Sequence, residues 1–243
     1  MTATRLLAGA SGYAFKEWQG SFYPDKIKAE DMLAWYAERL PTVEINNTFY
    51  RMPKPAVLEN WSQATPVDFR FAIKASRRIT HDARIKADAA DSVAYLYRML
   101  ASLGGKLGAV LFQLPPNLKK NLPRLEAFLQ MLPDGHRAAL EFRNESWFDD
   151  ETYALLRQAN AALVLSERED NAAPPLVETA AWGYVRLRLE NYSDDDLKHW
   201  AERLAATKWS ETLVYFMHEP TAPGYARTLL DMTLKMARET GAR

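Results

Sequence analysis

The feature that most constrains the fold is a repeated pattern, in which a short apolar run ends in charged residues and a helical stretch follows. The clearest case is the segment 42–50, TVEINNTFY, where Val43 and Ile45 alternate with Glu44 and Asn46. Alternation with a period of two is typical of a β-strand with one face in an apolar core. The other face then carries a carboxylate, whose burial is costly unless the charge is paired.

Eight segments of the chain fit the strand pattern. We predict strands at residues 6–9, 42–48, 70–76, 108–114, 138–143, 161–166, 184–189 and 212–218. We predict helices at 31–40, 55–64, 88–103, 121–131, 150–159, 194–206 and from Pro223 to near Gly241. Asp149 is expected to cap the helix at 150–159, and Ser193 with Asp196 the helix at 194–206.

Strands joined by helical crossovers run parallel, and eight of them close a barrel. We therefore predict an α/β protein: one TIM-type (β/α)8 barrel over residues 1–243, with a shortened or irregular helix after the sixth strand. An open doubly wound sheet is the alternative. The barrel is favoured because no Gly-x-Gly-x-x-Gly motif follows the first strand.

Composition excludes several function classes. Lys plus Arg equals Asp plus Glu at 31 each, so net charge does not favour nucleic acid as a partner. The chain has no Cys, which excludes a disulfide, a thiolate nucleophile and a Cys-ligated metal. No apolar run is long enough to span a membrane, and the one near the N-terminus is too short for a signal peptide, so we expect a cytoplasmic protein without a membrane partner.

In such a barrel the functional side chains gather at the C-terminal ends of the strands. Alternation points Glu44, Lys74 and Glu141 away from their apolar neighbours and toward the barrel axis. With His81, from the loop after the third strand, they are the candidate catalytic residues. The candidate ligand-binding residues are Ser11, Asn46, Tyr50, Arg77, Gln113, Arg143, Trp147, Arg186, Arg188 and His218.

Buried charges of both signs must pair with each other or hold a ligand. For any single residue a structural ion pair is the alternative, but the concentration of charges at strand ends favours a ligand site. We expect Lys74 to be the cation that meets Glu44. Aromatic residues in loops at the same end either wall a cleft or pack in the core; these are Trp18, Tyr23, Phe49, Tyr50 and Trp147.

Four chemistries fit these residues unequally. Glu44, Glu141, His81 and His218 could supply metal ligands but form no spacing motif, so we predict no metal site, and the sequence identifies no cofactor. Glu44 and Glu141 are candidates for a glycosidase pair. Lys74 would form an imine with a carbonyl substrate only if burial lowered its pKa, which a nearby Glu44 opposes.

The basic side chains favour the fourth chemistry, which is phosphate or phosphodiester binding, because guanidinium groups hold phosphate through two hydrogen bonds. They are Lys74, Arg77, Arg78, Arg143, Arg186 and Arg188.

Several ordered motifs carry a family resemblance. They are GASGY at 9–13, FYP at 22–24, VEINNTFY at 43–50, FRFAIK at 69–74, TH at 80–81, LFQLPP at 111–116, EFR at 141–143 and SWF at 146–148. Through them the chain resembles the YecE-like family, domain of unknown function 72, over nearly its whole length. The resemblance implies a TIM-type barrel and implies no activity.

The chain departs from the family pattern in its last third. The seventh strand usually ends in Arg-Leu-His-Gly and here reads RLRL at 186–189, while the eighth usually ends in Phe-Asn-Asn and here reads FMHE at 216–219. Asn47 stands where a serine is common.

Two functions therefore stay open. The first is an enzyme acting at the barrel mouth on a small anionic or phosphorylated ligand or a phosphodiester. The second is a non-catalytic barrel that binds nucleic acid or a partner.

Overall fold

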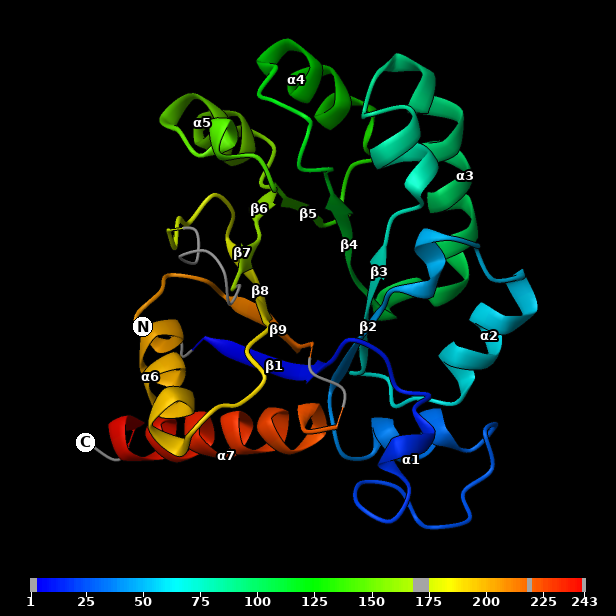
Figure 1. Ribbon diagram of the computed structural model, residues 1–243, viewed down its shortest axis with the longest axis vertical. Helices are drawn as coiled ribbons and strands as arrows, with labels where there is room; N and C mark the ends of the chain where they lie inside the picture. Colours follow the sequence, from blue (N-terminus) through cyan, green and yellow to red (C-terminus); the bar gives the residue numbers. More distant parts are fainter. Residues whose placement is uncertain (1–3, 168–174, 218–219, 242–243) are drawn as a thin grey trace.

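The computed structural model describes residues 4–167, 175–217 and 220–241, whose strands form one sheet wound into a barrel (Figure 1). Every strand pair in it is parallel, and the order is β6-β5-β4-β3-β2-β1-β9-β8-β7. The strands are β1 Arg5–Ala10, β2 Thr42–Ile45, β3 Arg70–Lys74, β4 Leu107–Gln113, β5 Ala138–Glu141, β6 Ala162–Leu163, β7 Leu165–Ser166, β8 Trp182–Leu187 and β9 Glu211–Phe216.

The sixth predicted strand closes the barrel. It is divided at Val164 into β6 and β7, which pair with different neighbours. Ala162 of β6 lies opposite Ala139 of β5, whereas Ser166 of β7 lies opposite Arg186 of β8. One segment thus joins both ends of the sheet, which confirms the predicted barrel and excludes the open doubly wound sheet.

The helices lie around the outside of the strands (Figure 1). They are α1 Met32–Ala37, α2 Pro55–Gln63, α3 Ala90–Leu100, α4 Leu122–Met131, α5 Asp150–Gln158, α6 Asp194–Ala205 and α7 Ala222–Gly241. Short 3₁₀ turns are η1 Lys16–Trp18, η2 Asn47–Phe49, η4 Ala87–Ala89, η5 Ala101–Lys106 and η6 Glu145–Trp147, and η3 Arg78–Asp82 is a π-helical turn. In the connection from β7 to β8 the structure describes residues 167 and 175–181, and these contain no helix.

Both predicted helix caps are present. Asp149 accepts a hydrogen bond from the Thr152 amide at 2.9 Å, and Ser193 and Asp196 form a reciprocal capping box. The predicted strand at 42–48 is shorter than expected and ends at Ile45. The Thr48 hydroxyl contacts the carbonyl oxygens of Ile45 at 3.0 Å and Lys74 at 2.7 Å, and so holds the chain in a turn.

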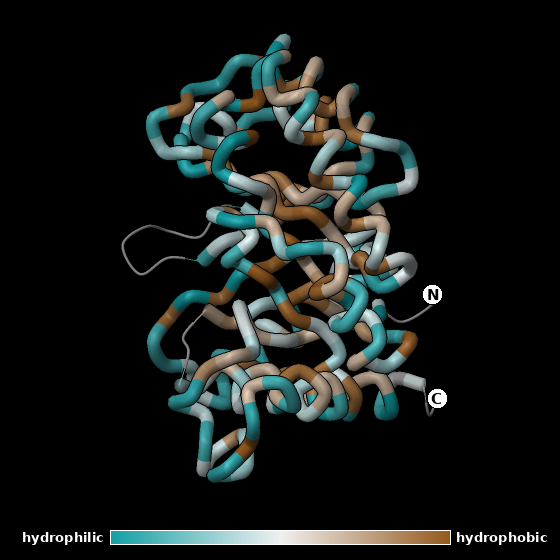
Figure 2. Tube along the Cα trace, turned by 90° about the vertical axis from the view of Figure 1, so that its right-hand side faces the viewer, coloured by the Kyte–Doolittle hydropathy of each residue, from teal (hydrophilic) through white to brown (hydrophobic). Residues whose placement is uncertain are grey.

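Alternation along the strands produces two separate apolar cores. Val43, Ile45 and Phe71 belong to the larger core between barrel and helices, whereas Tyr184 and Tyr215 belong to a smaller core inside the barrel. Figure 2 shows hydrophobic residues concentrated along the central strands and hydrophilic ones toward the outer loops. The larger core contains these strand residues together with helix residues such as Leu58 and Leu96, which confirms that the apolar sets of the strands meet the helices.

Gly9 allows β1 and β2 to approach closely. A Cβ atom at Gly9 would lie 1.9 Å from the Thr42 carbonyl oxygen and 2.9 Å from the Tyr36 hydroxyl. That hydroxyl donates to Thr42 O at 2.9 Å and accepts from the Ala10 amide at 2.8 Å. Any side chain at residue 9 would therefore separate these groups.

We predict that Gly9→Ala lowers the free energy of unfolding by about 3 kcal/mol, since the added methyl group meets backbone that cannot move aside. Urea denaturation measures the change. Gly105→Ala is the matched control, because a Cβ atom there meets nothing within 4 Å; it should change stability by less than about 0.5 kcal/mol. Equal losses in both variants would contradict the close approach at Gly9.

Candidate functional site at the mouth of the barrel

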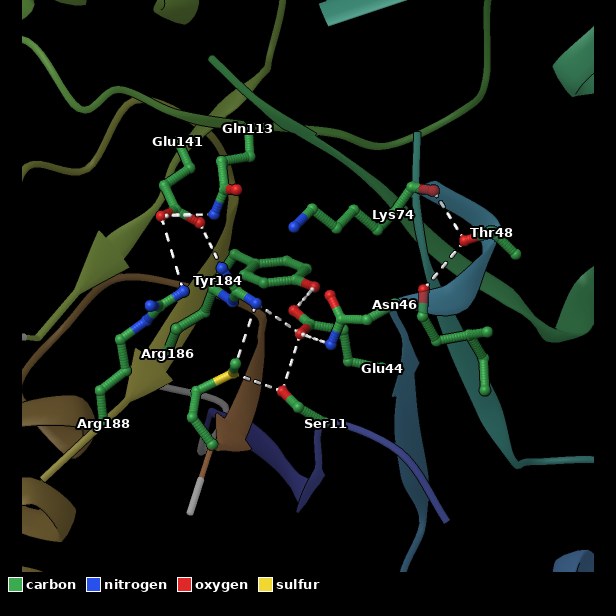
Figure 3. A network of polar contacts seen from close by, with 12 residues as sticks. Ser11, Glu44, Asn46, Thr48, Lys74, Gln113, Glu141, Tyr184, Arg186 and Arg188 are labelled. Carbon is green, nitrogen blue, oxygen red and sulfur yellow. Dashed lines mark hydrogen bonds and ion pairs between the residues drawn. The ribbon is translucent and has the colours of Figure 1, made fainter. Parts of the chain in front are cut away.

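The centre of the site is Arg186 on β8, whose guanidinium group lies between two buried carboxylates (Figure 3). Its Nη2 donates to Glu44 Oε1 at 2.8 Å, and its Nη1 donates to Glu141 Oε2 at 2.5 Å. The side chains of all three residues are at most 1% exposed. The cation thus links β2 to β5 across the inside of the barrel.

Neutral donors complete the surroundings of Glu44. Oε1 also accepts from Ser11 Oγ at 2.7 Å and from Asn46 Nδ2 at 3.0 Å, and Oε2 accepts from the Tyr184 hydroxyl at 2.6 Å. These side chains come from the end of β1, the end of β2 and from β8. The carboxylate is therefore held in one orientation.

Glu141 is surrounded mainly by cations. Oε1 accepts from Gln113 Nε2 at 2.9 Å and Arg143 Nε at 3.2 Å, and Arg188 Nη2 lies 3.8 Å from the same oxygen. Sequence reasoning placed these residues together correctly but chose the wrong partner for Glu44. Arg186, not Lys74, is ion-paired with it. The sheet is wound so that the inward side chains of β8 and β2, which are separated by β9 and β1, meet inside the barrel.

Charge pairing determines the ionisation of both carboxylates. Burial alone would raise the pKa of Glu44, but Arg186 and the donors Tyr184 and Ser11 outweigh burial and hold the pKa below its usual range. Burial would also raise the pKa of Glu141, but Arg186, Arg188 and Arg143 lower this pKa to about 2. Both groups are therefore ionised near neutral pH.

Lys74 differs from the other basic residues of the site. Its side chain points toward the centre of the cluster, and within the described residues its amine has neither a hydrogen bond nor an ion pair (Figure 3). The amine lies 4.6 Å from the centre of the Phe49 ring. Burial, followed by the charge of Arg186, lowers the pKa of Lys74 to about 8.

Some buried polar atoms at this end of the barrel have no partner. Within the described structure these are Arg186 Nε, Arg188 Nε, Asn46 Oδ1 and Ser166 Oγ. Such atoms are normally satisfied, so their concentration at one place indicates room for water or a ligand. Beside them, between the ends of β1 and β2, is a cavity of about 260 Å³ lined by Ser11, Asn46 and aromatic side chains including Trp61.

The loop after Lys74 holds His81 in a distorted backbone. His81 belongs to the π-helical turn Arg78–Asp82, and the following Arg84 and Ile85 have φ angles of 52° and 54°. A positive φ is costly for a β-branched residue, and strained backbone of this kind clusters at functional sites. The His81 ring packs on Phe49 at 4.9 Å, and burial together with Lys74 lowers its pKa.

Several expected site residues lie elsewhere. Trp147 is fully buried, stacks on Phe142 at 4.7 Å and donates its N–H to the Leu118 carbonyl at 2.7 Å, so it supports a loop and does not wall a cleft. Trp18 and Tyr23 are likewise buried in the outer core.

Tyr50 is 78% exposed on the outer rim, and Arg77 forms a surface ion pair with Asp82 at 3.2 Å. His218, expected at the end of the eighth strand, lies outside the described residues.

The sequence does not identify Tyr184 as a site residue, although its hydroxyl donates a hydrogen bond to Glu44. An aromatic residue inside an apolar run resembles ordinary core. The available signal was the alternation that places residues 184, 186 and 188 on one face of the strand.

No three His, Asp or Glu side chains gather to hold a metal ion within the part of the chain that the structure describes. In the same part, no helix combines the length and apolar character needed to cross a membrane.

Fold and site together define a parallel α/β barrel with a buried charge cluster at the C-terminal mouth. The family model "Protein of unknown function DUF72" matches residues 7–242, and the chain belongs to this family. It is 27% identical to the UPF0759 protein YecE of Escherichia coli K12, over 85% of this chain and 87% of that protein. It is 32% identical to the UPF0759 protein YunF of Bacillus subtilis, over 55% of this chain and 50% of that protein.

Solved structures agree with the fold. A DUF72 family protein from Thermotoga maritima superposes with a TM-score of 0.79 at 25% identity, covering 96% of this chain and 99% of that one. A DUF72 family protein from Enterococcus faecalis gives a TM-score of 0.76 at 19% identity, with 94% of each chain covered. None of these descriptions names an activity.

We predict that Glu141→Gln lowers the free energy of unfolding by about 3–5 kcal/mol, because it removes the counter-charge of Arg143 and Arg188 and one of the two counter-charges of the buried Arg186. Chemical denaturation measures the loss. Glu151→Gln is the control, since Glu151 pairs with Lys120 at 2.9 Å but is 69% exposed; it should cost less than about 1 kcal/mol.

Acid should reveal the same ion pairs. A carboxylate with a lowered pKa stabilises the fold above its ordinary pKa of 4.5, and this contribution is lost as the pH falls toward about 2. The stability of the native protein should fall more steeply across this range than that of Glu141→Gln. If the stability of the native protein and that of Glu141→Gln depended on pH in the same way, Glu141 would not be ion-paired in solution.

Proposed function

We propose that the barrel mouth binds a small ligand that carries a phosphate or carboxylate group. The observation that carries the proposal is an excess of cations: four basic side chains, Lys74, Arg143, Arg186 and Arg188, face the two carboxylates of the cluster. An excess of buried charge of one sign is unfavourable unless a counter-charge arrives. An anion at the mouth supplies it.

The cations have different roles in this proposal. Arg186 is buried and uses both terminal nitrogens on Glu44 and Glu141, so it holds the frame of the site. The side chains of Arg143 and Arg188 are 28% and 22% exposed and, within the described residues, form ion pairs only with Glu141, which leaves donors for a ligand. Burial and the neighbouring Arg186 lower the pKa of Arg188 to about 10, as expected for a cation that lacks sufficient counter-charge.

The carboxylates also receive a revised role. Sequence reasoning offered Glu44 and Glu141 as acid or base, but a general acid or base works best with a pKa near the working pH. Ion pairing moves both pKa values in the opposite direction. We assign both residues to holding Arg186, and we assign proton transfer to His81, whose pKa is lowered by burial and by Lys74.

We predict that Arg143→Gln and Arg188→Gln each weaken the binding of inorganic phosphate by roughly tenfold to a hundredfold, the effect of losing one charge-assisted hydrogen bond. Isothermal titration calorimetry measures the affinity, and thermal melting confirms that each variant is folded. Arg77→Gln is the matched control, because Arg77 already pairs with Asp82 on the surface. Phosphate affinity that is equal in all four proteins would refute the proposal.

The same titration contains a second signature. An anion beside Lys74 favours the charged amine, so phosphate binding should draw a proton from solution at pH values just above the pKa of about 8. Titrations in buffers of different ionisation enthalpy detect this proton. Lys74→Met should abolish the uptake while leaving the protein folded.

A groove on the rim favours a second candidate, an extended phosphodiester. The groove has a volume of about 450 Å³ and includes Tyr50, Arg51, Arg78 and Tyr95 in its lining. Exposed aromatic rings with basic side chains are typical of single-strand binding. Salt-dependent binding of a short oligonucleotide that is lost in Tyr50→Ala with Tyr95→Ala would favour this candidate over a small ligand.

A further inference from the structure

We propose that Lys74 is a covalent catalyst, whose amine condenses with the carbonyl group of an anionic aldehyde or ketone held at the barrel mouth. The inference rests on the proposed function and extends it, because the same cations hold the anionic group of the substrate. It names the reacting atom and the substrate class: a small carbonyl compound with a carboxylate or phosphate.

The position of Lys74 carries the inference. It is the last residue of β3, and its carbonyl oxygen accepts a hydrogen bond from Thr48 at 2.7 Å, so its backbone is fixed at the mouth. The side chain is partly buried and aimed into the cluster (Figure 3). Its amine, contacting the Phe49 ring, has no polar partner within the described residues.

Two other lysines, by contrast, have polar partners for their amines. Lys106 is also partly buried, but its amine donates to Thr65 O at 2.6 Å and to Thr65 Oγ1 at 3.2 Å. Lys120 pairs with Asp149 and Glu151. A structural lysine uses its hydrogens in this way, whereas an amine that must attack a carbonyl needs a free lone pair.

The charges that face Lys74 favour the neutral amine. Arg186 on β8 and Arg143 after β5 oppose a further positive charge, while Glu141 on β5 and Glu44 on β2 favour it. Both carboxylates are already paired with Arg186, so burial and the cations prevail and the pKa falls to about 8. His81, in the loop after β3, packs on the Phe49 ring, which the Lys74 amine also contacts.

The condensation is balanced without an oxidant, reductant or second substrate. The lone pair of the neutral amine forms the C–N bond, and the π-electron pair of the carbonyl moves to oxygen, which takes up a proton. Nitrogen loses one proton, the oxygen takes up another and leaves as water, and the nitrogen lone pair forms the C=N bond of an iminium ion. This ion then loses its remaining N–H proton to give the imine, so the two protons gained by oxygen equal the two lost by nitrogen. One amine and one carbonyl thus give one imine and one water.

The test is reductive trapping with pyruvate and sodium cyanoborohydride, followed by peptide mass spectrometry. We expect one reduced pyruvyl group on Lys74, with exposed Lys28 and hydrogen-bonded Lys106 unmodified under the same conditions. Lys74→Arg and Lys74→Met should lose the modification while melting near the temperature of the native protein. Acetone, a ketone without an anionic group, should react at least about tenfold more slowly, because it lacks the charge-assisted contacts.

Inorganic phosphate distinguishes a failure of the covalent role of Lys74 from a failure of the proposed anion site. It should protect Lys74 from pyruvate, and its affinity is measured on the same sample by calorimetry. Phosphate binding without any adduct on Lys74 overturns the covalent role and leaves the anion site standing. Absence of both phosphate binding and the adduct overturns both proposals. Labelling of lysines in proportion to their surface exposure overturns the assignment of Lys74. Equal reaction rates for pyruvate and acetone overturn the anionic substrate class.

Discussion

The structure depends on one interaction, the contact of the Arg186 guanidinium with Glu44 and Glu141 inside the barrel. A cation between two carboxylates pairs with both of them and links β2, β5 and β8 across the inside of the barrel. Because all three side chains are excluded from solvent, removing Arg186 would leave the Glu44 carboxylate buried without an ion-pair partner, at a cost of several kcal/mol. The remaining cations are arranged around this frame, and their excess charge gives the mouth its affinity for anions in our proposal.

The frame is possible because the barrel has a second, internal apolar core beneath it. Tyr184 and Tyr215 belong to that core, their rings lying 5.2 Å apart, and the hydroxyl of Tyr184 reaches up to Glu44. The aromatic floor excludes water from one side of the cluster, while the mouth stays accessible through Lys74, Arg143 and Arg188. This asymmetry separates buried residues that hold the site from partly exposed residues that can contact a ligand.

Sequence reasoning predicted much of this arrangement. Period-two alternation correctly placed Glu44 and Glu141 inside the barrel, because the side-chain direction along a strand follows from local geometry. The sequence did not reveal the partner of Glu44, Arg186, which is 142 residues away in the chain. The prediction that Trp147 binds a ligand was also wrong, because a loop aromatic that packs in the core and one that lines a cleft look the same in the sequence.

The sequence by itself determined the strands, their inward faces, the helix caps and the family, all of which depend on residues close together in the chain or on ordered motifs. Only the tertiary structure decided which charges meet. Winding of the sheet into a closed barrel brings the inward side chains of β8, β2 and β5 together, and no short segment of the sequence encodes these contacts. The same closure leaves Lys74 without a counter-charge of its own, and so creates the amine on which the proposed chemistry depends.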